Sequence, residues 1–230
     1  MTRSPARLLL AAALACGSCG APAAGVPDAT ELTALLPAIS PNFGDLAKRL
    51  PLAFDPAFKS PCWWDAEAGL LCLPFAYLAG FPKCGTTTLW SQLAISHRNL
   101  VRSSKMATKE PQWWTRNAEA EPFLGYAKTF RENRDKILLS PAANVYLDGS
   151  VQLAWEPMLH SVVEHKLLPP HVLASVQPAA RALLLVREPT ARLWSDFTYF
   201  EKRTEPDVFD ARVGEQIEWL GRCFCGGGGG

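Results

Sequence analysis

The stretch FAYLAGFPKCGTTTLW, residues Phe75–Trp90, decides the fold of this 230-residue chain. It begins with a short apolar run, Phe75–Ala79, and continues into a turn that holds Lys83 and Gly85. Three threonines then open a helical pattern over Thr86–Ser96. This order predicts a strand, a tight turn and a helix, which is the repeating unit of an α/β protein.

The same turn has the chemistry of a phosphate-binding loop. The free N–H groups and the positive dipole end of a helix's first turn attract an anion. Lys83 adds a full positive charge beside them, and Thr86, Thr87 and Thr88 can cap the helix or donate to the anion. We therefore expect the loop to hold a phosphate-bearing ligand. The alternative is that Lys83 is an ordinary solvated lysine.

Composition bounds the class of protein and its partners. A chain of 230 residues suits one α/β domain, and its hydrophobic fraction of 48% and charged fraction of 20% are those of a globular protein. The net charge is +1, so any basic site must be local, and we expect no nucleic-acid partner. The histidines and cysteines do not show the spacing of metal ligands, so we expect no metal ion.

The N-terminus has the pattern of a secretory signal. Arg3 and Arg7 precede the apolar run Leu8–Cys16, and small residues follow. The run is shorter than the roughly 20 apolar residues that a membrane span needs. We expect residues 1–24 to be a signal peptide or a short signal-anchor. The protein then enters the secretory pathway and meets the membrane only through such an anchor.

Secretory entry favours a disulfide between Cys62 and Cys72. These cysteines flank the polar turn DAEAG between two apolar stretches, so in an oxidising compartment they can close a small loop. Cys84 lies inside the phosphate loop. It is a small buried side chain or, alternatively, a nucleophile without a base next to it.

Three further segments complete the expected organisation. Residues 25–60 are rich in proline and alanine, with a weak helical pattern over Asp28–Leu36, and we expect a poorly ordered lead-in. A compact domain is expected over 61–222. The tail 223–230 ends in a glycine run that behaves as flexible coil, so the domain looks truncated.

Within the domain, periodicity predicts several more elements. An amphipathic helix is expected over 119–134 and strand-like pieces at Ile137–Leu139 and Asn144–Leu147. Helices are expected over Val151–His165 and, after the break at two prolines, over His171–Val176.

A second strong signal is the apolar run Arg181–Val186, which predicts a buried strand. Pro189 suits the first turn of a following helix, so Arg187 sits at the carboxyl end of this strand. Ligands of open α/β sheets bind there, and a second basic strand end suggests a ligand with two phosphates. Ser195 lies about two helical turns further on. The alternatives are an ion pair of Arg187 with Glu188 and an ordinary helix serine.

The loop is not a Walker A motif, because its lysine precedes the second glycine. Instead, PKCGTTTLW resembles the 5′-phosphosulfate loop of sulfotransferases, which use 3′-phosphoadenosine 5′-phosphosulfate. REPTARLWSDF resembles the 3′-phosphate motif of the same superfamily. The stretches PCWWDAEAGLLCLPFAYLAGFPKCGTTTLW and ATKEPQWWTRN resemble the Golgi carbohydrate sulfotransferases, especially the N-acetylgalactosamine 4-sulfate 6-O-sulfotransferase group that acts on chondroitin or dermatan sulfate.

This resemblance implies a P-loop-like sulfotransferase fold, with a central parallel sheet flanked by helices. It implies a sulfate-donor nucleotide and a glycan acceptor as partners, in the Golgi lumen. Lys83 would stabilise the bridging oxygen as the S–O bond breaks, and Glu110 would be the general base. The remaining donor-binding residues would be Cys84, Gly85, Thr86, Thr87 and Thr88 at the phosphosulfate, and Arg187 and Ser195 at the 3′-phosphate.

Some alternatives remain open at this point. Glu110 is either that base or a surface carboxylate paired with Lys109. Trp113 and Trp114 are core aromatics or a stacking surface for a sugar. Three hypotheses remain for the function of the whole chain. It is a sulfotransferase, a truncated protein that binds nucleotide without turnover or, as the third hypothesis, a nucleotide kinase.

Overall fold

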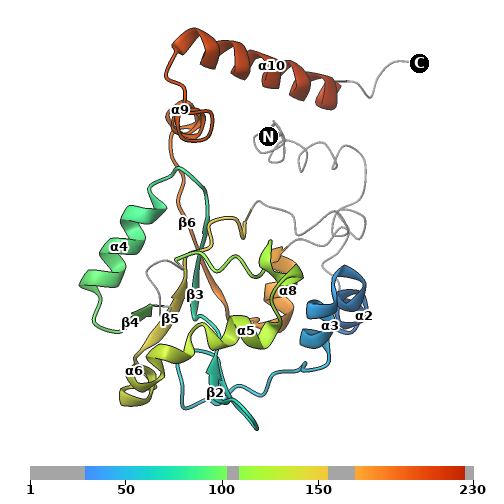
Figure 1. Ribbon diagram of the computed structural model, residues 1–230, viewed down its shortest axis with the longest axis vertical. Helices are drawn as coiled ribbons and strands as arrows, with labels where there is room; N and C mark the ends of the chain where they lie inside the picture. The colour runs from blue at the N-terminus through green and yellow to red at the C-terminus, as the bar shows by residue number, and fades with distance from the viewer. Residues whose placement is uncertain (1–28, 103–108, 155–168, 226–230) are drawn as a thin grey trace. The chain divides into compact units, whose positions relative to one another are not determined.

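The computed structural model describes residues 29–102, 109–154 and 169–225 (Figure 1). It divides into two compact units. Of the described residues, those within Val26–Val186 form one unit and those from Arg187 onward form the other.

The larger unit is built on a four-stranded parallel sheet in the order β4-β5-β3-β6. The strands are β3 (Ala76–Gly80), β4 (Leu100–Arg102), β5 (Val145–Asp148) and β6 (Arg181–Leu184). The expected mixed α/β class with a parallel sheet is therefore confirmed. So are the strands expected near Phe75–Ala79 and Asn144–Leu147, to within one residue at each end.

Side chains of β3 alternate between two hydrophobic clusters, as the pleat of a strand requires. Tyr77 and Ala79 belong to the larger cluster, whereas Leu78 belongs to the smaller one. Helix α4 (Thr86–Ser96) places Trp90 in the smaller cluster, and α8 (Pro169–Val176) packs in the larger one. Helices thus cover both faces of the sheet, and Figure 1 shows α4 on one side and α8 on the other.

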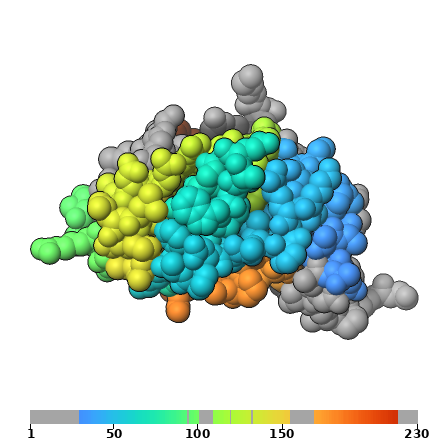
Figure 2. All heavy atoms as spheres, turned by 90° about the horizontal axis from the view of Figure 1, so that it is seen from below, coloured from blue at the N-terminus to red at the C-terminus, as the bar shows by residue number. Residues whose placement is uncertain are grey.

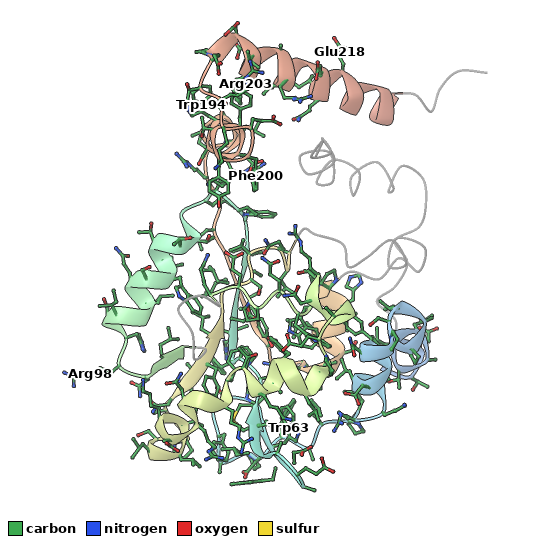
Figure 3. All side chains as sticks on the ribbon, viewed as in Figure 1. Trp63, Arg98, Trp194, Phe200, Arg203 and Glu218 are labelled. Atoms are coloured by element: carbon green, nitrogen blue, oxygen red, sulfur yellow. A yellow bond between two sulfur atoms is a disulfide. The ribbon has the colours of Figure 1, made fainter. Side chains whose placement is uncertain are left out.

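An antiparallel hairpin of β1 (Cys62–Asp65) and β2 (Gly69–Cys72) lies outside the main sheet. Its register puts Cys62 opposite Cys72, and the two form a disulfide, which confirms the expected pairing. Trp63, labelled in Figure 3, is buried and its ring stacks on Phe123 with 6.1 Å between centroids.

Residues 29–47 form two helices that pack in the core, contrary to the poorly ordered lead-in expected there. Helices α2 (Ala29–Ile39) and α3 (Pro41–Ala47) contribute fully buried side chains to the larger cluster, namely Leu32, Leu36, Phe43 and Leu46. Ser40 caps α3 by accepting a hydrogen bond from the Phe43 N–H at 3.2 Å. The weak helical pattern in the sequence of this segment corresponds to α2, which places Leu32 and Leu36 in the core. In Figure 2 this segment (blue) forms one continuous surface with the hairpin segment (cyan).

The continuous helix expected over 119–134 is wrong. The segment forms a 3-10 turn η2 (Asn117–Glu119), α5 (Phe123–Lys128), a 3-10 turn η3 (Arg131–Asn133) and α6 (Arg134–Leu139). Pro122 precedes α5 and disfavours a helical residue before it, so the helix cannot run through. The strand expected at Ile137–Leu139 is also wrong, because these residues end α6.

Two other expectations had mixed outcomes. The helix expected over His171–Val176 is confirmed as α8, and it begins at Pro169, within the proline pair where a break is expected. Val151–Ala154 form turns, and the rest of the helix expected to His165 lies outside the described residues.

Strand β6 is present, but its expected burial is wrong. All four of its residues are exposed, and Leu184 retains 55% of its accessible surface. The strand lies at one edge of the sheet, and a continuous apolar run does not by itself distinguish an edge from a centre.

The smaller unit contains α9 (Pro189–Phe200) and α10 (Pro206–Cys225). Trp194 (labelled in Figure 3) packs edge-on against Phe209 at 5.1 Å, and Phe197 contacts both rings. Within the described ranges, no helix has the length and apolarity that a membrane crossing requires.

Candidate functional site

The turn after β3 leads directly into α4, whose observed bounds match the expected ones. Gly85 is the N-cap residue and has φ = 84°, a left-handed conformation that favours glycine. Lys83 also has a positive φ, of 65°, which is uncommon for a residue with a side chain. Such conformations persist where the surrounding structure enforces them, and they are common in ligand-binding loops.

The start of α4 can accept an anion. Gly85 has no side chain to cap the helix, so the N–H groups of the first turn depend on other partners. A Cβ at Gly85 would meet no described atom within 4 Å, so the N-cap faces space. Thr86 is buried, whereas Thr87 and Thr88 are exposed. The expected cradle of backbone and hydroxyl groups is therefore compatible with a phosphate.

The structure brings Lys109 and Glu110 to this helix start. The Lys109 ammonium lies 3.3 Å from Thr87 Oγ1 and 3.5 Å from Thr86 Oγ1, across a separation of 22 and 23 residues. It also donates to Glu110 Oε1 at 2.8 Å. Glu110 thus forms the ion pair that was one alternative. The same pair places it beside the candidate phosphate loop, so the two interpretations are compatible.

Both carboxylate oxygens of Glu110 have partners. Lys109 holds Oε1, and the Gln112 side-chain amide donates to Oε2 at 3.1 Å. The side chains of Lys109 and Glu110 retain 13% and 27% of their surface, so the carboxylate is partly shielded and still reachable from solvent. Sequence reasoning considered Lys109 only as a partner of Glu110 and did not consider Gln112.

The two tryptophans that follow are core residues. Trp113 and Trp114 are 0% and 1% exposed, and they pack in an aromatic cluster with Tyr126 at 5.5 and 5.9 Å between centroids. This burial selects the core alternative over the sugar-stacking surface. It also anchors the chain immediately after Glu110 and Gln112 to the interior.

The carboxyl end of β5 meets the same segment. Asp148 is fully buried and accepts hydrogen bonds from the Tyr126 hydroxyl and the Ser150 N–H, both at 2.7 Å. Burial raises the pKa of Asp148, against the hydrogen bonds that lower it, and the nearby charge of Glu110 raises it further. Sequence reasoning identified Asp148-Gly149-Ser150 only as the end of a strand and gave these residues no role in the site. The feature that could have pointed to the site is the sequence DGS at the carboxyl end of a parallel strand, where the ligand sites of α/β proteins lie.

Arg187 and Ser195 belong to the smaller unit. Arg187 precedes the N-cap residue of α9, and Ser195 is half-buried within that helix. Glu188 is the N-cap of α9, because its carboxylate accepts from the Thr190 and Ala191 N–H groups at 2.9 and 2.6 Å. These two hydrogen bonds lower the pKa of Glu188. A shared phosphate site with the loop after β3 stays a prediction.

Two remaining site predictions concern Cys84 and metal ions. Cys84 is half-buried and carries a free thiol, and its role in the loop stays a prediction. Among the residues that the structure describes, no three His, Cys, Asp or Glu side chains are grouped so that they could hold a metal ion.

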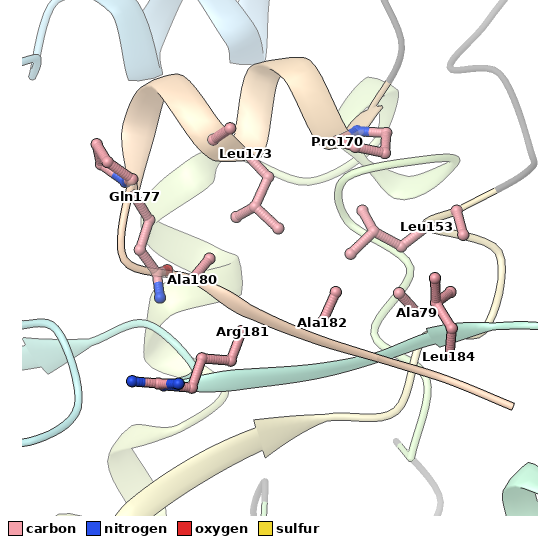
Figure 4. Close-up of a pocket in the computed structure, with 12 residues that line it drawn as sticks. Ala79, Leu153, Pro170, Leu173, Gln177, Ala180, Arg181, Ala182 and Leu184 are labelled. Atoms are coloured by element: carbon pink, nitrogen blue, oxygen red, sulfur yellow. The ribbon is translucent and has the colours of Figure 1, made fainter.

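A cavity of about 340 Å³ lies between β3, β6 and α8 (Figure 4). Its lining is mostly alanine, leucine and proline, and comes from β3, β6, α8 and Leu153–Ala154. The polar side chain of Gln177 is engaged elsewhere, with the Tyr77 hydroxyl and the Pro74 carbonyl. The charged side chain of Arg181 lies over the Phe75 ring, 5.3 Å from its centroid, and the lining has no carboxylate or histidine that could act as a base, so the candidate site is the loop and not the cavity.

No family model matches the chain, and no solved structure matches it significantly. The chain is similar to carbohydrate sulfotransferase 15 of Homo sapiens, with 24% identity over 267 residues, covering 80% of this chain and 46% of the relative. The proteins of the same name from Mus musculus and Rattus norvegicus are 24% identical over 251 residues, covering 76% of this chain and 44% of theirs. The chain thus spans less than half the length of the curated relatives it matches. At the level of the family, and not of a specific group within it, this similarity supports a carbohydrate sulfotransferase.

Proposed function

We propose that this chain transfers a sulfuryl group from 3′-phosphoadenosine 5′-phosphosulfate to a hydroxyl of a glycosaminoglycan-type sugar. One observation carries the proposal: the Lys109–Glu110 pair lies against the first-turn threonines of α4. A carboxylate and a candidate phosphate loop are thus side by side, as the reaction needs. The similarity to carbohydrate sulfotransferases supplies the class of donor and acceptor.

Each residue has a role that the chemistry requires. Glu110 takes the proton of the acceptor hydroxyl, whose oxygen forms the new bond to sulfur. The bond between sulfur and the 5′-phosphate oxygen breaks, and Lys83 stabilises the charge that develops on that oxygen. The N–H and hydroxyl groups of Gly85 and Thr86–Thr88 hold the phosphate in line for the displacement.

Further parts of the proposal extend beyond this loop. Arg187 and Ser195 bind the 3′-phosphate of the donor, for which a guanidinium offers bidentate hydrogen bonds. The acceptor is a chondroitin or dermatan sulfate chain, and the reaction takes place in the Golgi lumen. These details come from the motif resemblance given above.

The direct test is transfer of labelled sulfate from the donor nucleotide to chondroitin sulfate by the purified chain. We expect Lys83→Ala and Glu110→Gln to lower kcat by about 100-fold or more, the usual size of general-base and electrostatic contributions. The exposed residues Glu67 and Lys136 supply matched controls, because Glu67→Gln and Lys136→Ala change the same charges far from the loop in sequence.

Other outcomes select other functions. Binding of 3′-phosphoadenosine 5′-phosphate without any sulfate transfer would identify a non-catalytic nucleotide-binding protein. Phosphoryl transfer from ATP would instead support the kinase alternative. Equal activity of Glu110→Gln and the unaltered chain would refute the assignment of Glu110 as the base.

A further inference from the structure

We infer that the segment Asp148-Gly149-Ser150, at the carboxyl end of β5, positions Glu110 for proton transfer. The inference rests on the proposed function, because it takes Glu110 as the general base. It adds three positioning residues that do not themselves contact the reacting atoms.

Two hydrogen bonds clamp the backbone on either side of Glu110. The Gly149 N–H donates to the Lys109 carbonyl at 3.0 Å, and the Gln112 N–H donates to Ser150 Oγ at 2.8 Å. The residues between these two bonds are Glu110 and a proline, whose ring fixes its own φ. The short stretch that carries the base is therefore tied to the end of β5 at both ends.

The clamped residues are the ones that hold the carboxylate. Lys109 donates to one oxygen of Glu110 and Gln112 to the other, at 2.8 and 3.1 Å. Gln112 has φ = 53°, so its backbone depends on its neighbours to stay in place. Its carbonyl accepts hydrogen bonds from the backbone N–H groups of Thr115 and Arg116. A shift of the clamp therefore moves both partners of the Glu110 carboxylate together.

Gly149 is required for this approach. A Cβ at Gly149 would lie 2.7 Å from the Lys109 carbonyl oxygen and 2.9 Å from Cε3 of Trp90. Any side chain there would push away the backbone that precedes Glu110. Ser150 is anchored in turn, because its N–H donates at 2.7 Å to the buried carboxylate of Asp148. The clamp is thus fixed to the interior of the larger unit.

Orientation matters for this chemistry, because a base must lie within hydrogen-bond distance of the proton that it removes. We expect Ser150→Ala to lower kcat about tenfold or more, since small misplacements of reacting groups have effects of that size. Binding of 3′-phosphoadenosine 5′-phosphate, measured by calorimetry, should stay near that of the unaltered chain, because the loop after β3 is untouched.

Ser60 supplies a matched control at the other end of the same strand. Its hydroxyl is buried and accepts a hydrogen bond from the Tyr146 N–H at 3.0 Å, a bond of the same kind as that of Ser150. Ser60→Ala should therefore lower the melting temperature about as much as Ser150→Ala while leaving kcat unchanged. Gly149→Ala is the second variant, and it should reproduce the loss of kcat by displacing the Lys109 backbone.

A double-variant cycle separates positioning from general damage. If Ser150 acts through Glu110, Ser150→Ala should change the residual kcat of Glu110→Gln by less than about twofold. If Ser150→Ala lowers kcat equally in the unaltered chain and in Glu110→Gln, the positioning role is overturned. It is likewise overturned if Ser150→Ala and Gly149→Ala have the same kcat as Ser60→Ala, and in both cases the proposed function stands. An unaltered chain that transfers no sulfate would overturn the proposed function, and this inference with it.

Discussion

Asp148 is a carboxylate in the interior of the protein, where it accepts hydrogen bonds from the Tyr126 hydroxyl and the Ser150 N–H. Burial disfavours its charged form, and the Glu110 charge acts in the same direction. Tyr126 is affected in turn, because burial and the Asp148 charge raise the pKa of its hydroxyl well above the usual value. These buried groups connect the aromatic core to the candidate site.

The raised pKa of Asp148 predicts a pH dependence of stability. Below the ordinary value of 3.8, both the folded and the unfolded chain hold the proton, so nothing is lost. As the pH rises from 3.8 to the raised folded pKa, the unfolded chain has released this proton while the folded chain still holds it, so stability falls over that range. We expect the free energy of unfolding of the unaltered chain to fall, relative to that of Asp148→Asn, from about pH 4 upward.

Urea denaturation of both proteins across this pH range measures the difference. Glu110 and the other carboxyl groups are present in both chains, so their titration largely cancels. A difference that is flat, or that rises with pH, would contradict the raised pKa.

At the scale of elements, a helix or strand was predicted correctly where neighbouring residues in the sequence mark its start and end. Helix α4 was predicted with its observed bounds, because a glycine and three threonines mark its start and apolar spacing marks its length. The helix expected over 119–134 failed, because its periodicity was continuous while Pro122 interrupts the backbone. Apolar spacing alone also misassigned Ile137–Leu139, which end a helix.

The hairpin β1–β2 gives a prediction at this scale. Its disulfide joins cysteines 10 residues apart, and closing such a loop restricts the unfolded chain. Replacing both Cys62 and Cys72 by serine should lower the free energy of unfolding by about 2–3 kcal/mol.

Urea denaturation without reducing agent is the measurement, and Cys84→Ser is the matched control because that thiol is free. The reduced unaltered chain should unfold like the double serine variant. A double variant as stable as the oxidised chain would rule out a stabilising disulfide.

At the scale of the whole molecule, both hydrophobic clusters lie within Val26–Val186. Helices α2 and α3 are part of the larger cluster and cannot be removed without exposing it. The smaller unit has aromatic contacts of its own between α9 and α10.

This division predicts that residues 26–186 fold by themselves. The fragment should unfold cooperatively in urea and should keep the near-UV circular dichroism of its buried tryptophans, Trp113 and Trp114. A fragment that begins at residue 61 is the control, and it should lose both properties because it lacks α2 and α3. Non-cooperative unfolding of residues 26–186 would show that the larger unit needs the rest of the chain.

The sequence alone was sufficient to predict the features that depend on residues close together along the chain. It predicted the strand, turn and helix around Lys83, the parallel α/β class and the pairing of Cys62 with Cys72. Its identification of Glu110 came from a resemblance between motifs, and its assignment of Arg187 and Ser195 to a shared phosphate site stays a prediction. The similarity to carbohydrate sulfotransferases agrees with the motif resemblance at family level.

Only the tertiary structure decided which distant residues meet. The sheet order puts β5 next to β3, so Ser150 can hold the segment around Glu110 beside the start of α4. It also decided burial, since Trp113 is in the core while β6 is exposed at an edge. Periodicity along a chain describes one element at a time. Contacts between elements depend on how the parallel sheet is assembled, and no local pattern encodes that.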